Sequence, residues 1–236
     1  MTRLRDQLSA ERRSLPWVKV EKNYVFDAPD GKKTLAALFE GRSQLIVYHF
    51  MFGPGWKEGC PSCSFLADHI DGAVVHLAAR NVTFAVVSRA PLAEILPFQQ
   101  RMGWRFKWVS SQGSDFNYDF HATTDEAVTP VEYNYRDKAM LDQLGHTYHV
   151  KGEQPGASVF YRNGGRIYHT YSTYGRGLDL LVGAYNYLDL VPKGRDEDDL
   201  AFTMAWVRHH DRYGDGYAVD AAAQYVAPRE SVSSPG

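Results

Sequence analysis

QLIVYHF at residues 44–50, followed by a loop that ends in CPSC at residues 60–63, is the stretch that decides the fold of this chain. The first segment is a continuous apolar run of strand length, which is typical of a strand buried on both faces of a parallel sheet. The loop that joins the two segments is rich in glycine and proline. After CPSC, apolar residues recur every three or four positions, which predicts one amphipathic helix over residues 61–80.

The residues that follow repeat this alternation. VTFAVV at residues 82–87 predicts a second buried strand, the spacing of residues 92–102 predicts a helix, and FKWVS at residues 106–110 predicts a third strand. This order predicts a parallel sheet whose helical connections cross over in the right-handed sense. The fold class is therefore α/β, with helices on the faces of a central sheet.

Shorter elements are expected before the first buried strand. Residues 1–16 are charged and predict an N-terminal helical extension that stops before the proline at its end. The alternation at residues 17–20 predicts a strand, and residues 34–40 predict a short helix that ends near Gly41.

The second half contains an irregular stretch and then a hairpin. Residues 112–155 lose periodicity, and we interpret them as a long insertion. Two β-rich segments follow at residues 158–162 and 166–171, joined through an Asn-Gly pair at 163–164, which is the strongest short-range signal of a hairpin. A hairpin makes the predicted sheet mixed rather than purely parallel.

The size fits a single domain. With 236 residues, of which 44% are hydrophobic, the chain is long enough for one well-filled core. We expect the domain to span residues 17–228, with a last helix at about residues 178–187 and a disordered tail at 229–236.

The charge pattern excludes several kinds of partner. The formal net charge is −2, and no basic stripe runs along the chain, so we expect neither a nucleic-acid nor a membrane partner. The first residues lack the apolar core of a secretory signal, and no run of roughly 18 apolar residues occurs. The two cysteines are too few for a secreted disulfide framework. The predicted location is the cytoplasm.

The two cysteines carry the chemistry that the sequence predicts. Cys60 stands where the predicted helix begins, and unpaired backbone N–H groups there stabilise a thiolate, which is the reactive form. Cys63, one turn further on, is close enough to close a disulfide and so to resolve a mixed disulfide on Cys60. Because Pro61 has no N–H group, the backbone donors to the Cys60 sulfur are expected to be Ser62 and Cys63.

Two alternatives for the same cysteines stay open at this point. In the first alternative, the two cysteines are incidental thiols of a core. In the second, they bind copper or zinc together with histidine. His169 is the first histidine to consider for such a metal site, and His69 and His76 lie on the predicted helix of the cysteines. Otherwise no cofactor is expected.

Other polar clusters are interpreted as surface features. His209-His210-Asp211 are adjacent residues, whose side chains point to different sides of any regular element. Asp115, Asp119, Arg176 and Asp179 lie among aromatic residues, and an acid near Cys63 would accept its proton, but solvated charges and helix caps are the expected roles.

Several longer strings resemble a known family. They are YHFMFGP at 48–54, GCPSCSF at 59–65, VSRAP at 87–91, RMGW at 101–104, SDFN at 114–117 and HTYSTY at 169–174. Together they resemble the bacterial thioredoxin-like family catalogued as domain of unknown function 899, over roughly residues 15–213. The resemblance implies a thioredoxin-like fold and no established reaction. The opening FDAPDG at 26–31 looks like the peroxiredoxin branch of that superfamily.

The resemblance to that superfamily also implies departures at the site. Peroxiredoxins place a threonine three residues before the reactive cysteine, where this chain has Lys57, and thioredoxins place tryptophan directly before it, where this chain has Gly59. The cis-proline that faces the cysteines in thioredoxins has Pro155 as its candidate, with Gly156 also at a fitting position. Pro61, Ser62, Trp56 and Pro155 are the residues expected to support the site.

The sequence thus favours a thiol–disulfide oxidoreductase in which Cys60 attacks and Cys63 resolves. The first alternative is a thiol peroxidase or a reductase of small disulfides. The alternative of another class is a copper- or zinc-binding protein that uses Cys60, Cys63 and His169. A separate pocket built by the insertion is a further alternative. The expected partner is a protein or small-molecule thiol or disulfide, and a homodimer is compatible with the sequence.

Overall fold

The computed structural model describes residues 2–213. Its elements are α1 (Thr2–Arg13), β1 (Val18–Lys19), β2 (Val25–Ala28), β3 (Gly31–Thr34), α2 (Leu35–Leu38), β4 (Gln44–His49), α3 (Pro61–Ala67), α4 (Asp71–Ala79), β5 (Val82–Ser88), α5 (Leu92–Arg101), β6 (Lys107–Ser110), α6 (Phe116–Asp119), β7 (Thr123–Thr124), β8 (Glu132–Tyr133), β9 (Arg136–Asp137), α7 (Lys138–Gln143), the 3-10 helix η1 (Thr147–His149), β10 (Gly152–Glu153), β11 (Gly156–Asn163), β12 (Arg166–Tyr174), η2 (Gly175–Leu181), α8 (Gly183–Leu188) and η3 (His210–Arg212).

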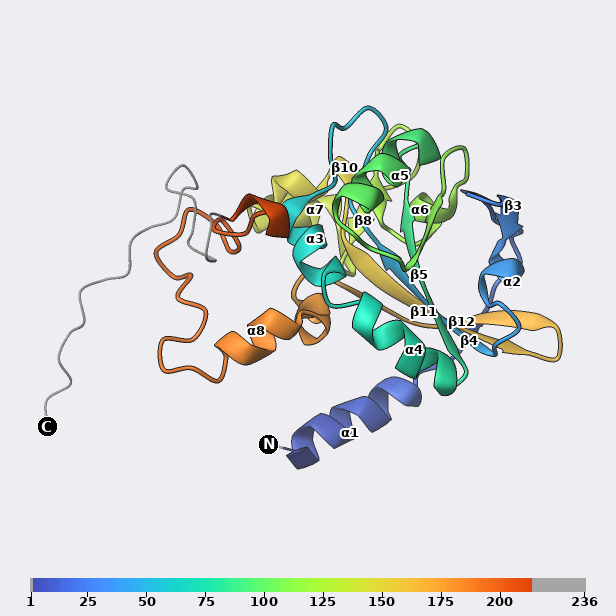
Figure 1. Cartoon of the computed structure of the whole chain (residues 1–236), viewed down its shortest axis with the longest axis horizontal. Helices are drawn as coiled ribbons and strands as arrows, with labels where there is room; N and C mark the ends of the chain where they lie inside the picture. The colour runs from blue at the N-terminus through green and yellow to red at the C-terminus, as the bar shows by residue number, and fades with distance from the viewer. Residues whose placement is uncertain (1, 214–236) are drawn as a thin grey trace, which may run out of the picture.

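A sheet of eight strands forms the centre of the molecule (Figure 1), in the order β1-β12-β11-β4-β5-β6-β2-β3. The strands β4, β5 and β6 are parallel, as the strand–helix alternation predicts. The hairpin β11–β12 lies antiparallel beside β4, and β2 lies antiparallel beside β6. A strand that leads into the cysteine helix, a parallel neighbour on one side and a hairpin on the other make up a thioredoxin-like fold, so the predicted fold class is confirmed.

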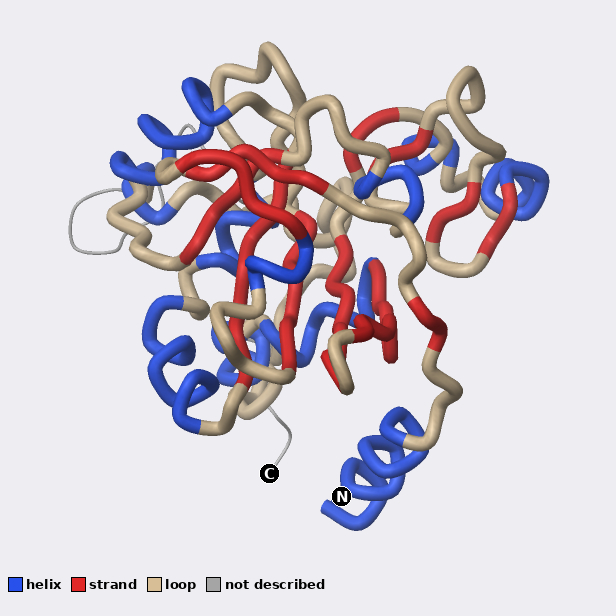
Figure 2. The backbone as a smooth tube through the Cα atoms, turned by 90° about the vertical axis from the view of Figure 1, so that its right-hand side faces the viewer, coloured by secondary structure: helices blue, strands red, loops and turns tan. Residues whose placement is uncertain are grey.

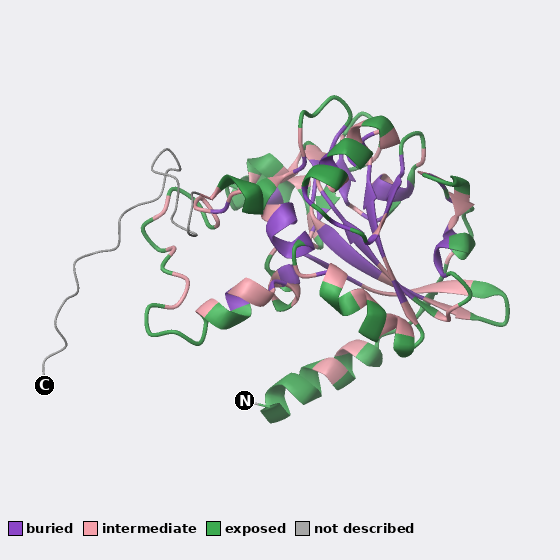
Figure 3. Cartoon of the chain, in the orientation of Figure 1, coloured by how far each residue is buried: buried purple, intermediate pink, exposed green. Residues whose placement is uncertain are grey.

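Both faces of the sheet are covered, and this is why the central strands read as continuous apolar runs. Tyr48 and Val86 face a cluster that also contains side chains of α3 and α5. Val47 and Ala85 point to the opposite face, where α2 and Phe116 of α6 pack. Buried residues therefore gather along the sheet and on α3 (Figure 3), and α3 is held directly against β4.

The expected single helix over residues 61–80 is wrong, because the chain forms two helices, α3 and α4. At the break, the N–H groups of His69 and Ile70 donate to carbonyls three residues back, which tightens the backbone. Asp71 then accepts the backbone N–H groups of Arg105 and Phe106 at 2.8 and 2.7 Å. These contacts to the chain before β6 start α4 on a different axis, and Ile70 is buried at the corner.

The stretch 112–155 contains several short elements, from α6 to β10, that its lack of periodicity did not predict. Phe116 and Phe120 fill the core on the face opposite to α3. Tyr133 and Leu141 form a small buried cluster with Tyr174 of the hairpin. These residues are therefore built into the main fold.

The two ends of the described chain differ from each other. Helix α1 has no buried residue and projects from the rest of the molecule (Figure 2), which it contacts near its C-terminal end, where Arg12 lies over the ring of Tyr171 in β12. The predicted last helix is shorter than expected, because residues 175–181 form the 3-10 helix η2 before α8 begins. The domain end at residue 228 and the tail at 229–236 lie outside the described residues. Within residues 2–213, no helix has the length and apolarity that a bilayer span needs.

Candidate active site

The loop after β4 delivers Cys60 to the N-cap of α3, directly before the first helical residue. The Cys60 N–H group donates to the carbonyl of Met51 at 3.1 Å, which closes the base of the loop. The N–H group and the hydroxyl of Ser64 both donate to the Cys60 carbonyl at 2.9 Å, which starts the helix. Pro61 occupies the first helical position, where its missing N–H group costs no hydrogen bond.

Gly59 is required by packing. A Cβ atom on this residue would lie 2.5 Å from Cε1 of Phe50 and 2.8 Å from Cε1 of Phe98, both in the core. Real Cβ atoms do not approach carbon so closely, so no larger residue fits without moving the rings. This explains why glycine stands where thioredoxins have tryptophan.

Cys60 is half-buried and its thiol is activated. A hydrogen bond with the thiol of Cys63 lowers the pKa of Cys60 to about 7, and the backbone N–H groups of Cys63 and Ser62 contribute in the same direction. The latter two are the donors that the sequence predicts. The thiolate of Cys60 is therefore favoured over that of an ordinary cysteine.

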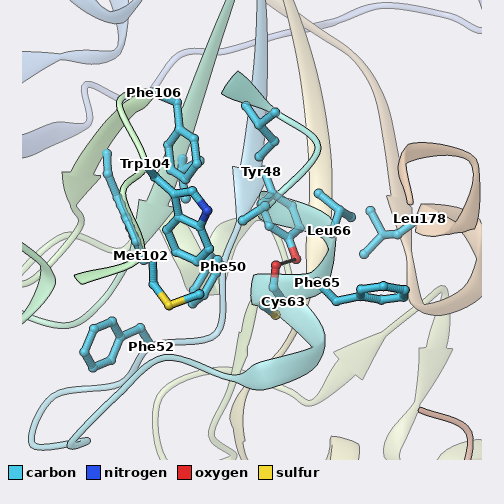
Figure 4. Close-up of a cluster of buried hydrophobic side chains, with 14 of the residues drawn as sticks. Tyr48, Phe50, Phe52, Cys63, Phe65, Leu66, Met102, Trp104, Phe106 and Leu178 are labelled. Carbon is cyan, nitrogen blue, oxygen red and sulfur yellow. Dashed lines mark hydrogen bonds between the residues drawn. The ribbon is translucent and has the colours of Figure 1, made fainter. Parts of the chain in front are cut away.

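Cys63 is in the opposite state. Its side chain is 2% exposed, and burial raises the pKa of Cys63 well above that of an ordinary thiol. The N–H group of Met51 donates to its sulfur at 3.5 Å. The hydroxyl of Tyr48 donates to the Cys63 carbonyl at 3.4 Å. Its closeness to the sulfur partly offsets the effect of burial on the pKa of Cys63. Figure 4 shows Tyr48 reaching from β4 to α3 with its hydroxyl beside Cys63.

The phenol of Tyr48 stays protonated. Tyr48 is 1% exposed, and burial raises the pKa of its hydroxyl well above 10. It can therefore donate a hydrogen bond to a sulfur that carries negative charge. The sequence offered one signal for this role, since a tyrosine inside an otherwise apolar strand needs a partner for its hydroxyl.

A small cavity opens above Cys60. Its volume is about 240 Å³. Its lining consists of Trp56, Glu58, Gly59, Cys60, Pro61, Arg208, His209 and Arg212. Residues 204–213, here called the C-terminal strap, thus build one wall, and the loop before α3 builds the other. Among the predicted supporting residues, Trp56 and Pro61 share this cavity with Cys60.

The prediction that His209 lies in a surface cluster is wrong. His209 is 2% exposed, and its Nε2 lies 2.9 Å from the carbonyl of Gly59, which can only accept. Its Nδ1 lies 3.2 Å from Nη2 of Arg101, which can only donate. Nδ1 also lies 3.4 Å from the Glu58 carboxylate, but its hydrogen bond is the one from Arg101, which requires an unprotonated Nδ1. The imidazole is therefore neutral with its proton on Nε2, and burial lowers the pKa of His209 in agreement with this.

Charged side chains hold the strap against the loop. Arg101 of α5 bonds Asp211 at 2.8 Å and Glu58 at 2.6 Å, and Arg212 bonds the same Glu58 oxygen at 2.8 Å. Trp206 packs edge-on against Phe65 of α3. The aromatic contact and the buried His209 bond contribute more to this docking than the ion pairs, which are partly exposed.

Pro155 is not the cis-proline expected to face the cysteines. Every described peptide bond is trans, including the one before Pro155. Its carbonyl accepts the hydroxyl of Tyr133 at 2.9 Å, and it does not line the cavity above Cys60. Tyr133 comes from the insertion, and burial raises the pKa of its hydroxyl.

The structure does not assemble the metal site of the alternative hypothesis. His169 bonds Ser172 at 2.8 Å, and through Ser172 and Ser158 it joins a row of hydrogen bonds that ends at the buried His49. His69 accepts the N–H group of Ala184 at 3.0 Å. Between residues 2 and 213, no three cysteine, histidine or acidic side chains group in a way that could hold a metal ion.

The acidic residues considered near Cys63 have other partners. Asp115 and Asp119 both pair with Lys22, and Asp179 pairs with Arg176 and Arg195. They are surface ion pairs, as expected.

The family model described as "Bacterial protein of unknown function (DUF899)" matches residues 1–213. The chain belongs to this family. The match includes the loop, both cysteines and the C-terminal strap, so the whole cavity above Cys60 lies inside the family's own boundaries. A comparison with curated proteins finds no match.

Among solved structures, the chain is similar to several peroxiredoxins. A serine-for-cysteine mutant of PrxQ from Xylella fastidiosa is 15% identical, with a TM-score of 0.46, and the match covers 72% of this chain and 95% of that one. Peroxiredoxin Q from Xanthomonas campestris is 13% identical, with a TM-score of 0.47 and coverage of 73% and 96%. Peroxidoxin BcpB from Mycobacterium tuberculosis is 9% identical, with a TM-score of 0.43 and coverage of 72% and 94%.

Proposed function

We propose that this protein is a thiol–disulfide oxidoreductase whose attacking group is Cys60 and whose resolving group is Cys63. The observation that carries the proposal is the asymmetry of the pair. Cys60 lines a cavity and has a pKa of about 7, whereas Cys63 is buried and has a raised pKa. A thiolate that lines a cavity, beside a protonated and buried thiol, is what a two-step exchange needs.

The reaction uses only the two thiols and a substrate disulfide. The Cys60 thiolate attacks one sulfur of the substrate, so that a Cys60–substrate disulfide forms, the substrate S–S bond breaks and one thiolate leaves. Cys63 then loses its proton and attacks the Cys60 sulfur, which releases the second substrate thiolate. Two electrons have passed from the dithiol to the substrate, and a thiol reductant must return them. We propose no cofactor for this cycle.

A redox titration tests the proposal. The protein is equilibrated in buffers of dithiothreitol in different ratios of its reduced and oxidised forms, alkylated, and analysed by mass spectrometry of the peptide that holds residues 60–63. We expect a reversible two-electron transition between the dithiol and an internal disulfide. The proposal fails if the two cysteines never form a reversible disulfide at physiological potentials.

The pKa of Cys60 gives a prediction of its own. At pH 7 a thiol with pKa near 7 is half ionised, roughly 15 times more than an ordinary thiol of pKa 8.5. Lower basicity makes each thiolate less nucleophilic, so the net gain in alkylation rate is roughly three-fold. The pH at the midpoint of the rate profile is therefore the better test of the lowered pKa. We expect the rate of alkylation of Cys60 by iodoacetamide to rise with a midpoint near pH 7, and Cys63 to react far more slowly throughout.

Tyr48 is expected to act in the second step. Tyr48→Phe keeps the ring and removes the hydroxyl that bonds Cys63. The pKa of Cys63 should then rise further, and resolution of the mixed disulfide should slow by roughly five-fold, which is the value of about 1 kcal/mol for one hydrogen bond. Single-turnover kinetics separates the two steps. Equal slowing of the initial attack on Cys60 would indicate a general structural effect and contradict this role.

Peroxide is the alternative oxidant for the same thiolate. Lys57 occupies the position that holds a threonine in peroxiredoxins, and its side chain is exposed. The resulting proposal is that Cys60 reacts with hydrogen peroxide about as fast as a free thiol of the same pKa. Stopped-flow oxidation measures this rate, and a value orders of magnitude higher would replace the disulfide reductase by a peroxidase.

A further inference from the structure

The cavity above Cys60 is small and chemically distinctive. Its volume of about 240 Å³ lies below the usual range for sites that enclose a whole drug-sized ligand. It therefore admits one arm of a small molecule, with the rest in solvent. Trp56 offers an apolar wall, and the strap offers two guanidinium groups, from Arg208 and Arg212.

Arg208 is held in place without a counter-charge. Its Nη1 donates to the carbonyls of Ala205 and Val207, both at 2.9 Å, and its backbone N–H group donates to the hydroxyl of Tyr213 at 3.0 Å. No carboxylate of the described residues forms an ion pair with Arg208. Within residues 2–213, its Nε and Nη2 groups have no hydrogen-bond partner, which leaves these donors for an anion.

The neighbouring charges leave a positive balance. Three guanidinium groups, of Arg101, Arg208 and Arg212, meet two carboxylates, of Glu58 and Asp211. His209 is neutral, as its hydrogen bonds show. Of these three guanidinium groups, the one without a paired carboxylate within residues 2–213 is that of Arg208, which lines the same cavity as Cys60.

We propose that the cavity selects low-molecular-weight disulfides that carry a carboxylate a few bonds from sulfur, with the carboxylate bound by Arg208. The inference rests on the proposed function. The covalent step is the same exchange: the Cys60–sulfur bond forms, the substrate S–S bond breaks, and the second half leaves as a carboxylate-bearing thiolate. A planar guanidinium binds a carboxylate through two parallel hydrogen bonds, which also orients the S–S bond toward Cys60.

Three disulfides of similar size and different charge test this selectivity. They are 3,3′-dithiodipropionate, which is anionic, bis(2-hydroxyethyl) disulfide, which is neutral, and cystamine, which is cationic. The rate constant of the reduced protein with each is divided by that of 2-mercaptoethanol with the same disulfide, which removes the intrinsic reactivity. We expect the anionic disulfide to exceed the neutral one by roughly ten-fold after this correction and the cationic one to fall below both. The preference should shrink in 1 M KCl.

Variants assign the preference to one residue. Arg208→Gln should reduce the corrected anionic-to-neutral ratio to near one, and Arg208→Lys should retain part of it because the charge remains. Arg166→Gln is the matched control, since Arg166 is exposed at the turn of the β11–β12 hairpin and is expected to leave the ratio unchanged. If Arg208→Gln unfolds the strap, the salt dependence and the Arg208→Lys variant still show whether the charge of Arg208 causes the preference for the anionic disulfide.

The outcomes separate this inference from the proposed function. Reaction with none of the three disulfides would overturn the proposed function itself. Reaction with all three at ratios equal to those of 2-mercaptoethanol would overturn the selectivity and leave the function intact. A preference that persists in Arg208→Gln would overturn the assignment to Arg208.

Discussion

Replacement of Cys63 by serine is expected to stop turnover and to leave the substrate attached to Cys60 through a disulfide. The first step needs only the thiolate of Cys60, which stays accessible in the cavity. The second step needs a sulfur one turn away, whose attack within the molecule is favoured by many orders of magnitude over attack by an external thiol at millimolar concentration. Intact-protein mass spectrometry after a brief reaction with bis(2-hydroxyethyl) disulfide should show one adduct per chain.

Cys60→Ser is the control for this experiment. This variant keeps Cys63, which is 2% exposed and has a raised pKa, so no adduct should form. An adduct on Cys60→Ser at a rate similar to that of Cys63→Ser would reverse the two roles. Failure of Cys63→Ser to accumulate any adduct would remove the mixed-disulfide mechanism.

Gly59→Ala is expected to destabilise the reduced protein by about 2 kcal/mol. The new Cβ atom would meet Phe50 and Phe98 at distances far inside van der Waals contact, and overpacking of a core costs typically about 1–3 kcal/mol. The entropy that alanine removes from the unfolded chain offsets only about 0.4–1 kcal/mol of this. Thermal denaturation should show a Tm lower by about 6 °C.

Gly72→Ala is the matched control for this substitution. Gly72 lies in helix α4, and a Cβ atom there would meet no heavy atom within 4 Å beyond its chain neighbours and the backbone of its own helix. The same change of one methyl group should stabilise the protein by about 0.5–1 kcal/mol, because alanine is the better helix former. Equal effects of the two substitutions would show that the packing around Gly59 is looser than the structure indicates.

The elements that the sequence predicts well are those with a local signal. The strands β4 and β5 are continuous apolar runs, and the hairpin has an Asn-Gly turn, so each is specified by a few neighbouring residues. The position of Cys60 ahead of a helix is equally local. The backbone donors to its sulfur follow from the missing N–H group of Pro61 alone.

The break between α3 and α4 shows where such signals end. Apolar spacing continues across residues 68–70, so periodicity predicts one helix. The break depends on Asp71, which bonds backbone groups at residues 105 and 106, and on the burial of Ile70. No window of local sequence contains these partners.

The same limit applies to the site. The sequence by itself determined which two sulfur atoms can react, because the spacing of the cysteines and the apolar strand before them lie within one segment of about twenty residues. Only the tertiary structure decided what surrounds them. His209 is buried, and Arg208 enters the cavity, because a strap about 150 residues further along the chain docks on Gly59 and α3. Long-range contacts of this kind depend on the shape of the folded core, and adjacent polar residues such as His209 and His210 give no sign of which one will be enclosed.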